Sequence, residues 1–283
     1  MEIERKSVEI ERKVVRYEVT DGVATITLNR PERLNSWTGR MSLEYRSALL
    51  EASEDESVRV VVVTGAGRGF CAGADSDALA GHAARGHYES GLDDTAPRPG
   101  YGVRPEFDAD MAYHFGVAKP IIAAINGGAA GIGFALACYC DLRFAAKGAK
   151  LTTAHGRLGL PAEFGLSWLL PKLVGVTHAA DLLLSSRIFL AEQAPPGLLN
   201  AVYVPEELMS AVGGYATRLA NDVSPASVSV TKRQLYRDLL GLGGDPAASI
   251  TDSVAMLSEM MGGADYREGV AALVEKRAPR FGE

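Results

Sequence analysis

Two glycine-rich turns hold the residues of this sequence that are best suited to chemistry. The first, GFCAGAD at residues 69–75, follows an apolar run at 58–64, and the second, NGGAAGIG at residues 126–133, follows an apolar run at 121–125. Because small side chains let backbone N–H groups approach a ligand closely, each turn can offer donors to an oxygen atom. Two donors that converge on one oxygen form an oxyanion hole, which stabilises an enolate or a tetrahedral intermediate.

The segments that must position these turns alternate between strand and helix patterns. Apolar alternation at 14–19 and 23–28 around an Asp-Gly pair predicts a β-hairpin. A helical spacing of apolar residues at 41–49 leads into a buried strand at 58–63. Residues 81–105 are rich in Gly and Pro, which predicts a surface excursion.

The rest of the chain becomes progressively helical. A strand is predicted at 142–145, and helical patterns are predicted at 108–117, 133–140, 166–173, 179–184, 205–221, 227–240, 249–261 and 266–277. We therefore expect an α/β fold with a flexible tail at 1–13, a core at 14–204 and a helical C-terminal region at 205–283.

The bulk properties limit the function classes. The chain has 283 residues, 47% of them hydrophobic, and a formal net charge of −6, which argues against nucleic-acid binding. Its three cysteines, Cys71, Cys138 and Cys140, are too few for a disulfide framework or a zinc site. A charged N-terminus and the lack of an apolar run of about 20 residues indicate no signal peptide and no membrane span. We expect a cytoplasmic protein.

Several common catalytic motifs are absent. The second turn reads G-x-x-G-x-G rather than the dinucleotide fingerprint, and no clear acidic residue ends a strand about 20 residues later. No G-x-S-x-G elbow, P-loop or H-E-x-x-H motif occurs. Serine hydrolase, nucleotide-binding and zincin chemistry therefore have no support in the sequence.

Both turns, read together with KPIIAAING at residues 119–127, resemble the crotonase superfamily, the enoyl-CoA hydratase/isomerase family. Further matching segments follow in the family's order: NRPERLN at 29–35, AEQA at 191–194, GLLN at 197–200 and EGVAALVEKR at 268–277. The resemblance implies a spiral of ββα units whose C-terminal helices assemble homotrimers, often paired into hexamers.

The resemblance also implies where a coenzyme A thioester would bind. In such proteins the thioester carbonyl lies between two backbone N–H groups, which here fall on Ala74 and Ile132. Arg33, Ala72 and Lys276 match positions that contact coenzyme A in the family, Lys276 from an adjacent subunit. Arg33 and Lys276 are equally compatible with solvated surface charges. The substrate would be an acyl-CoA thioester, with no metal and no separate cofactor.

The sequence departs from the family at the catalytic positions. Typical hydratases use two glutamates that handle the protons of one water, and these positions hold Ala135 and His155. Glu163 lies eight residues after His155, where resembling dienoyl-CoA isomerases and aryl-CoA dehalogenases have a catalytic aspartate. Beside an apolar pocket, the pKa of such a carboxyl group would rise, which suits proton transfer. Alternatively, Glu163 is only a helix-start residue.

Three further residues have two interpretations each. His155 is either an acid/base partner, since imidazole titrates near neutral pH, or a hydrogen-bonded polar wall residue. Asp108 and His114 precede Lys119 in a segment that lines the acyl pocket of relatives. Each of them either faces the substrate or is an ordinary solvated or hydrogen-bonded residue.

The leading hypothesis is an acyl-CoA lyase or isomerase in which Ala74 and Ile132 polarise the thioester and Glu163 transfers the proton. Two alternatives remain open: hydrolysis or C–C bond cleavage of an acyl-CoA by the same fold, and acyl-CoA binding without catalysis.

Overall fold

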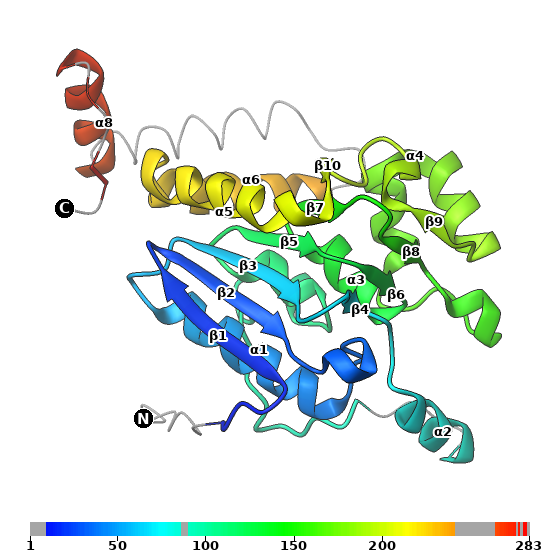
Figure 1. Cartoon of the computed structure of the whole chain (residues 1–283). Coiled ribbons are helices and arrows are strands. Elements are labelled where there is room, and N and C mark those ends of the chain that lie inside the picture. The colour runs from blue at the N-terminus through cyan, green and yellow to red at the C-terminus, as the bar shows by residue number, and fades with distance from the viewer. Residues whose placement is uncertain (1–9, 86–89, 241–263, 276, 278–279, 282–283) are drawn as a thin grey trace.

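Two sheets form the frame of the chain in the computed structural model, which describes residues 10–85, 90–240, 264–275, 277 and 280–281 (Figure 1). The larger sheet has six strands in the order β1 (Val15–Thr20), β2 (Val23–Leu28), β3 (Val60–Gly65), β5 (Ile121–Ile125), β7 (Leu142–Ala146) and β10 (Ala201–Tyr203). The smaller sheet has four, in the order β4 (Gly69–Cys71), β6 (Gly128–Ala130), β8 (Lys150–Thr152) and β9 (Phe189–Leu190). The fold is thus α/β, as predicted.

The predicted hairpin opens the larger sheet. Strands β1 and β2 are antiparallel, with Thr20 opposite Val23. The two turn residues, Asp21 (φ 49°) and Gly22 (φ 76°), both have positive φ, which matches the twist that a two-residue hairpin requires. The remaining neighbours in this sheet, from β2 to β10, pair in parallel.

Helices cover both faces of the larger sheet (Figure 1). Helix α1 (Gly39–Glu54) packs on one face, in a cluster with Val61 and Val63. Helix α5 (Pro205–Asp222) packs on the other face, in a second cluster with Val60 and Val62. Because successive strand residues point to opposite faces, the continuous apolar run of β3 is what burial on both sides requires.

Five further helices complete the described chain: α2 (Ser76–Arg85), α3 (Ile132–Tyr139), α4 (Leu166–Ser185), α6 (Pro225–Leu240) and α8 (Ala264–Glu275). The two helices predicted at 166–173 and 179–184 belong to α4, which is interrupted by non-helical geometry at Gly175 (φ 74°, ψ 161°). Across the described ranges, no helix is long and apolar enough to cross a membrane.

Two predictions of local structure were wrong, and a third concerns residues outside the described ranges. Residues 108–117 do not form an α-helix; they contain the 3-10 turn Ala112–Gly116, preceded by Met111 with a left-handed φ of 63° that breaks helical geometry. The surface excursion begins later than residue 81, because α2 extends to Arg85. The helix predicted at 249–261 lies outside the described residues.

Candidate active site

The smaller sheet brings the predicted site residues to one edge. Strands β4, β6 and β8 are parallel neighbours, with Cys71 opposite Ala129 and Ala130 opposite Thr152. Carboxyl ends of parallel strands meet at the same edge of a sheet, which is where ligands bind in many α/β folds. The loops that follow β4, β6 and β8 therefore all begin at the same edge of the smaller sheet.

One candidate residue follows each of these three strands. Ala74 comes after β4, Ile132 after β6 and His155 after β8. The two glycine turns, which follow β4 and β6, are in direct contact: a Cβ atom added at Gly73 would lie 3.2 Å from the carbonyl oxygen of Ala130. Gly73 also has a φ of 102°, a backbone conformation that favours glycine where the two loops meet.

The backbone N–H of Ala74 points away from Trp37, the residue with which Ala74 forms a parallel bridge. Trp37 donates its N–H to the carbonyl of Gly73 at 2.7 Å and accepts from the N–H of Asp75 at 2.9 Å, so these two bonds flank Ala74. Because successive peptide groups of an extended segment point to opposite sides, the N–H of Ala74 faces away from Trp37. This donor is available to a ligand.

The backbone N–H of Ile132 is available for a different reason. Ile132 is the first residue of α3, and the first N–H groups of a helix have no acceptor within it. They also carry the positive end of the helix dipole. Gly133, the next residue, brings this end close to β4, since a Cβ atom there would lie only 2.2 Å from the carbonyl oxygen of Cys71.

A buried carboxylate anchors the first turn. Asp75 is 3% exposed and accepts hydrogen bonds from Ser36 Oγ at 2.7 Å and Arg30 Nη1 at 2.9 Å. The hydrogen bond from Ser36 is the largest of the effects that lower the pKa of Asp75 to about 2. Arg33, a predicted coenzyme A contact, lies beside it, with Nη2 3.4 Å from Asp75 and 3.0 Å from Asp77.

The structure places the other predicted contacts as follows. Ala72, in the middle of the first turn, is exposed, and its backbone N–H donates to the carbonyl of Leu34 at 3.0 Å. Asp108 is exposed, and its carboxylate accepts the N–H of Gly102 at 2.8 Å, which closes the loop that contains both. Lys276 lies outside the described residues.

His155 is held in one tautomer by its surroundings. Its side chain is buried, with Nε2 3.1 Å from the carbonyl oxygen of Leu183. Because a carbonyl only accepts, Nε2 carries the proton, and Nδ1 of the neutral ring is left as an acceptor. Nδ1 is buried and has no hydrogen-bond partner among the described residues. The preceding Ala154 has a left-handed φ of 62°, a strained geometry that is typical of functional loops.

Glu163 is half-buried, and its carboxylate has no hydrogen bond or ion pair with any residue that the structure describes. Burial is the largest cause that shifts the pKa of Glu163, and it raises it; a smaller electrostatic effect from the nearby His155 lowers it. The cap position of α4 is Gly165, without a side-chain hydrogen bond, so Glu163 does not cap this helix. Tyr139 fixes the loop by donating its hydroxyl to the carbonyl of Phe164 at 2.8 Å.

Two other residues of interest belong to the core. Ala135 is fully buried in α3. His114 is also fully buried, with Nε2 2.7 Å from the Tyr45 hydroxyl and Nδ1 2.6 Å from the carbonyl oxygen of Met111. Burial is the main cause that lowers the pKa of His114 to about 3, so the ring is neutral at physiological pH. His114 is therefore a hydrogen-bonded core residue.

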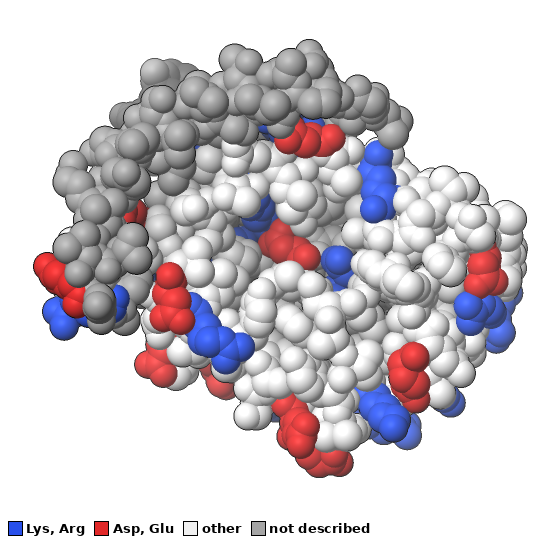
Figure 2. Space-filling model, turned by 90° about the horizontal axis from the view of Figure 1, so that it is seen from above, with Lys and Arg blue, Asp and Glu red and all other residues white. Residues whose placement is uncertain are grey.

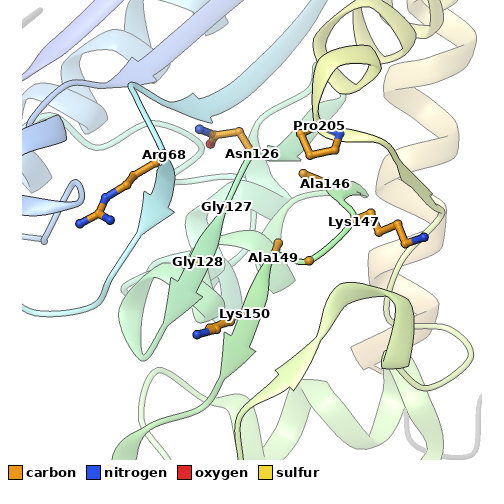
Figure 3. Close-up of a pocket in the computed structure, with 10 residues that line it drawn as sticks. Arg68, Asn126, Gly127, Gly128, Ala146, Lys147, Ala149, Lys150 and Pro205 are labelled. Atoms are coloured by element: carbon orange, nitrogen blue, oxygen red, sulfur yellow. The ribbon is translucent and has the colours of Figure 1, made fainter.

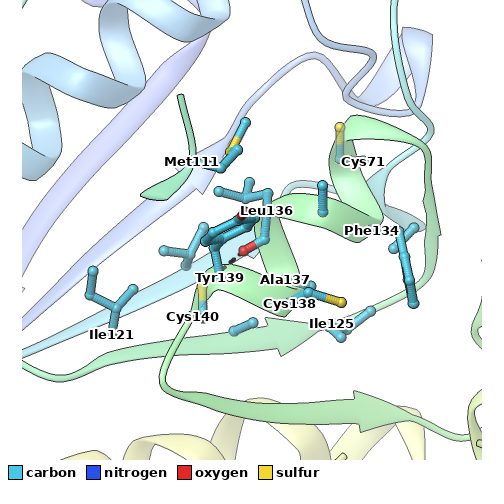
Figure 4. Close-up of a cluster of buried hydrophobic side chains, with 14 of the residues drawn as sticks. Cys71, Met111, Ile121, Ile125, Phe134, Leu136, Ala137, Cys138, Tyr139 and Cys140 are labelled. Atoms are coloured by element: carbon cyan, nitrogen blue, oxygen red, sulfur yellow. Dashed lines mark hydrogen bonds between the residues drawn. The ribbon is translucent and has the colours of Figure 1, made fainter. Parts of the chain in front are cut away.

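The cysteines offer neither a nucleophile nor a metal site. Cys71, Cys138 and Cys140 are free and buried in the apolar cluster around α3 (Figure 4). Burial raises the pKa of Cys71 and of Cys138 to about 12, so both stay thiols. Within the described ranges, no three His, Cys, Asp or Glu side chains are grouped to hold a metal ion.

Charged side chains do not form a large patch of one sign on the face seen from above. That face is mostly uncharged, and acidic and basic side chains lie next to each other on it (Figure 2).

Comparisons with known proteins identify the family of this chain. Residues 18–283 match the model of the enoyl-CoA hydratase/isomerase family. The chain is 34% identical to the 1,2-epoxyphenylacetyl-CoA isomerase of Escherichia coli K12, over 93% of this chain and 96% of that protein. It is 37% identical to the probable enoyl-CoA hydratase EchA12 of Mycobacterium tuberculosis H37Rv, over 92% and 89%.

A solved structure, of a probable enoyl-CoA hydratase/isomerase from Mycobacterium abscessus, matches with a TM-score of 0.80 and 32% identity, covering 94% of this chain and 98% of that one. The family model and the relatives each span most of the chain. The protein therefore belongs to the enoyl-CoA hydratase/isomerase family of the crotonase superfamily.

Proposed function

We propose that this enzyme binds an acyl-CoA thioester with its carbonyl oxygen between the N–H groups of Ala74 and Ile132. The observation that carries this proposal is the contact between the two glycine turns, each of which leaves one backbone donor unpaired. Donors fixed before the reaction stabilise the negative charge that develops on the oxygen of an enolate.

Glu163 is the proposed proton carrier. Its carboxylate takes a proton from the carbon beside the thioester, the C–H electron pair moves into the enolate, and the same group returns the proton to a carbon of the acyl chain. The raised pKa of Glu163 supports this role, because a general acid/base works best with a pKa closer to the working pH. Its carboxylate also has no partner within the described chain that would compete for the proton.

His155 is the proposed partner of Glu163. The hydrogen bond to Leu183 orients the ring and leaves Nδ1 as a proton acceptor. Nδ1 can then accept a hydrogen bond from protonated Glu163 or from a hydroxyl group of the substrate. Asp108 already bonds the loop backbone, and we assign it no step.

The names of the relatives cover two reactions, the isomerisation of an epoxyacyl-CoA and the hydration of enoyl-CoA. With Ala135 in place of one catalytic glutamate, the chain lacks the carboxylate pair that handles the protons of water. A single carboxylate can still move one proton within the acyl group. We therefore favour isomerisation over hydration.

The test is turnover of a panel of enoyl-, dienoyl- and hydroxyacyl-CoA esters by the wild type and by Glu163→Gln. Losing an essential acid/base should lower kcat about 10²–10⁴-fold. Glu106→Gln, a change at an exposed carboxylate paired with Arg104, is the matched control and should leave kcat unchanged. Wild-type rates in Glu163→Gln would remove Glu163 from the mechanism.

Product analysis and calorimetry distinguish this function from the two alternatives. Free acid products, or an acyl group trapped on Glu163, would identify a hydrolase. Calorimetric binding of acyl-CoA with no turnover of any ester would identify a binding protein.

For coenzyme A, we propose contacts from Arg33, from the backbone of Ala72 and from Lys276 of an adjacent subunit. Arg33 lies beside the first turn, and its ion pairs with Asp75 and Asp77 leave its side chain 44% exposed, which supports a role in phosphate binding. Arg33→Gln should raise KM for acyl-CoA and change kcat little.

We also propose a homotrimer or hexamer. Large apolar side chains of α4 support this assembly, since Val176 is 73% exposed and Leu184 is 86% exposed in the single chain. Light scattering of the purified protein tests it, and a monomeric mass at micromolar concentration would contradict it.

A further inference from the structure

A pocket lies at the edge of the smaller sheet that is opposite to the candidate active site (Figure 3). Its volume is about 280 Å³. Arg68 directly precedes β4, Gly127 precedes β6 and Lys150 begins β8, so the pocket is at the amino ends of three parallel strands. Ala74, Ile132 and His155 follow the carboxyl ends of the same strands.

Small residues form the floor of this pocket. Gly127 and Gly128 cross its middle, with Ala146 and Ala149 beside them (Figure 3). Gly127 cannot carry a side chain, because a Cβ atom there would lie 2.1 Å from the carbonyl oxygen of Arg68. The floor is thus packed backbone against backbone at Gly127. The volume of the pocket is near the lower end of the volumes of small-molecule sites.

Three cations surround this floor. Arg68 and Lys147 lie on opposite sides of it and Lys150 lies below, with exposed side chains that extend outward in Figure 3. None of the residues that line the pocket, all of them in the described chain, is acidic. This is a local excess of positive charge in a chain whose net charge is −6.

The three charged side chains make few hydrogen bonds or ion pairs with the described part of the chain. The side chains of Arg68 and Lys150 have no hydrogen bond or ion pair within the part of the chain that the structure describes. The pKa of Glu192 is lowered mainly by the N–H of Gly148, which donates to its carboxylate at 2.8 Å beside the pocket, and Lys147 lowers it further. Exposed side chains of this length change rotamer readily, so an anion on the floor can draw the charged groups over it.

We propose that this pocket binds a phosphate-bearing small molecule at a site separate from the thioester site. Arginine and lysine at the rim match the charge of a phosphate group, and the arginine fork can bond two of its oxygens. Its position at the amino ends of the strands separates this ligand from the thioester site at their carboxyl ends.

Pyrophosphate is the probe, titrated by calorimetry into the full-length protein at constant ionic strength, with no acyl-CoA present. The double variant Arg68→Gln/Lys150→Gln should weaken binding at least tenfold, and Lys150→Gln alone should weaken it less. Arg16→Gln removes one charge from an exposed position on β1 and is the control that should leave binding unchanged. Thermal unfolding checks that each variant is folded.

Any of three titration results would overturn the proposal: no binding of pyrophosphate by the wild type, an equal loss of affinity in Arg16→Gln, or displacement of pyrophosphate by coenzyme A with one-to-one competition. An altered oligomeric mass of the double variant without a change in pyrophosphate affinity would also overturn it, because the cations would then serve a contact between subunits. Since the titration needs no turnover, its outcome is independent of the proposed role of Glu163.

Discussion

Cys71 and Ala129 are opposite each other in the parallel ladder of β4 and β6, and this pairing brings the two glycine turns into contact. The same contact is tightened by α3, whose Gly133 lies against the carbonyl of Cys71. Two segments that are far apart in the sequence thus leave their free N–H groups at one edge.

Gly133→Ala should destabilise the protein and impair turnover. The added methyl would lie 2.2 Å from the carbonyl oxygen of Cys71, so α3 must shift away from β4, at about 1–3 kcal/mol for overpacking. Gly213→Ala is the matched control, since Gly213 also lies in a helix but has no atom within 4 Å of the added methyl. Chemical denaturation should show Gly213→Ala equal to or up to about 1 kcal/mol more stable than the wild type. Equal effects of both substitutions would contradict the close packing.

Asp75→Asn should lower the free energy of unfolding at neutral pH and make this free energy depend less on pH in the acid range. The pKa of Asp75 is depressed in the folded state to about 2, so its stabilising effect is present above the unfolded pKa of about 4. That effect is lost as the pH falls from about 4 to about 2. The hydrogen bonds to this charge should contribute about 1.5–3 kcal/mol. The free energy of unfolding, measured between pH 2 and 7, should differ most between the two proteins at neutral pH. A constant difference across this range would exclude titration of Asp75 as the cause.

The buried His114 should make the protein less stable as the pH falls below about 6.5. The unfolded chain takes up a proton there, whereas the folded pKa is lowered to about 3. Stability should fall by up to about 1.4 kcal/mol per pH unit between these values. His114→Gln should remove this slope, although it also disturbs the contact with Tyr45. His178→Gln, at an exposed position of α4, should leave the slope in place, and a slope that survives in His114→Gln would assign it to other groups.

The three cysteines should be unreactive in the native protein. All are buried, and burial raises the pKa of their thiols, so the thiolate that attacks a disulfide reagent is scarce. Ellman's reagent at pH 8 should detect almost no thiol in the folded protein and all three in denaturant. Fast labelling of one thiol, abolished by Cys71→Ala, would show that the first turn opens to solvent.

Long patterns of the sequence predicted much of the frame. The alternation around Asp21 and Gly22 predicted the hairpin, and the apolar run at 58–63 predicted a strand that is buried on both faces. These features are local, because a period of two or a continuous apolar run is visible within one segment.

The second sheet was not predicted. Strands β4, β6 and β8 have three residues each, too few to display a period, yet they align the candidate site. The helix expected at 108–117 failed because Met111 takes a left-handed φ, which tertiary packing imposes and propensity does not reveal.

Some candidate residues depend on contacts between distant segments. The anchoring of Asp75 by Ser36 and Arg30 was missed, although an acid at the end of the first turn and two arginines near residue 30 were visible signals. The tautomer of His155 depends on the carbonyl of Leu183, a backbone group that no side-chain pattern announces.

The central claim, that two backbone N–H groups polarise a thioester carbonyl, is tested most directly by isotope-edited infrared spectroscopy of a bound acyl-CoA labelled with ¹³C at that carbonyl. The stretching frequency should fall on binding to the wild type and to Ile132→Ala, which keeps the N–H. It should fall less on binding to Ile132→Pro, which removes the donor at the first position of α3, where proline is tolerated. A frequency in the wild type equal to that in water, or equal shifts in the alanine and proline variants, would contradict the account.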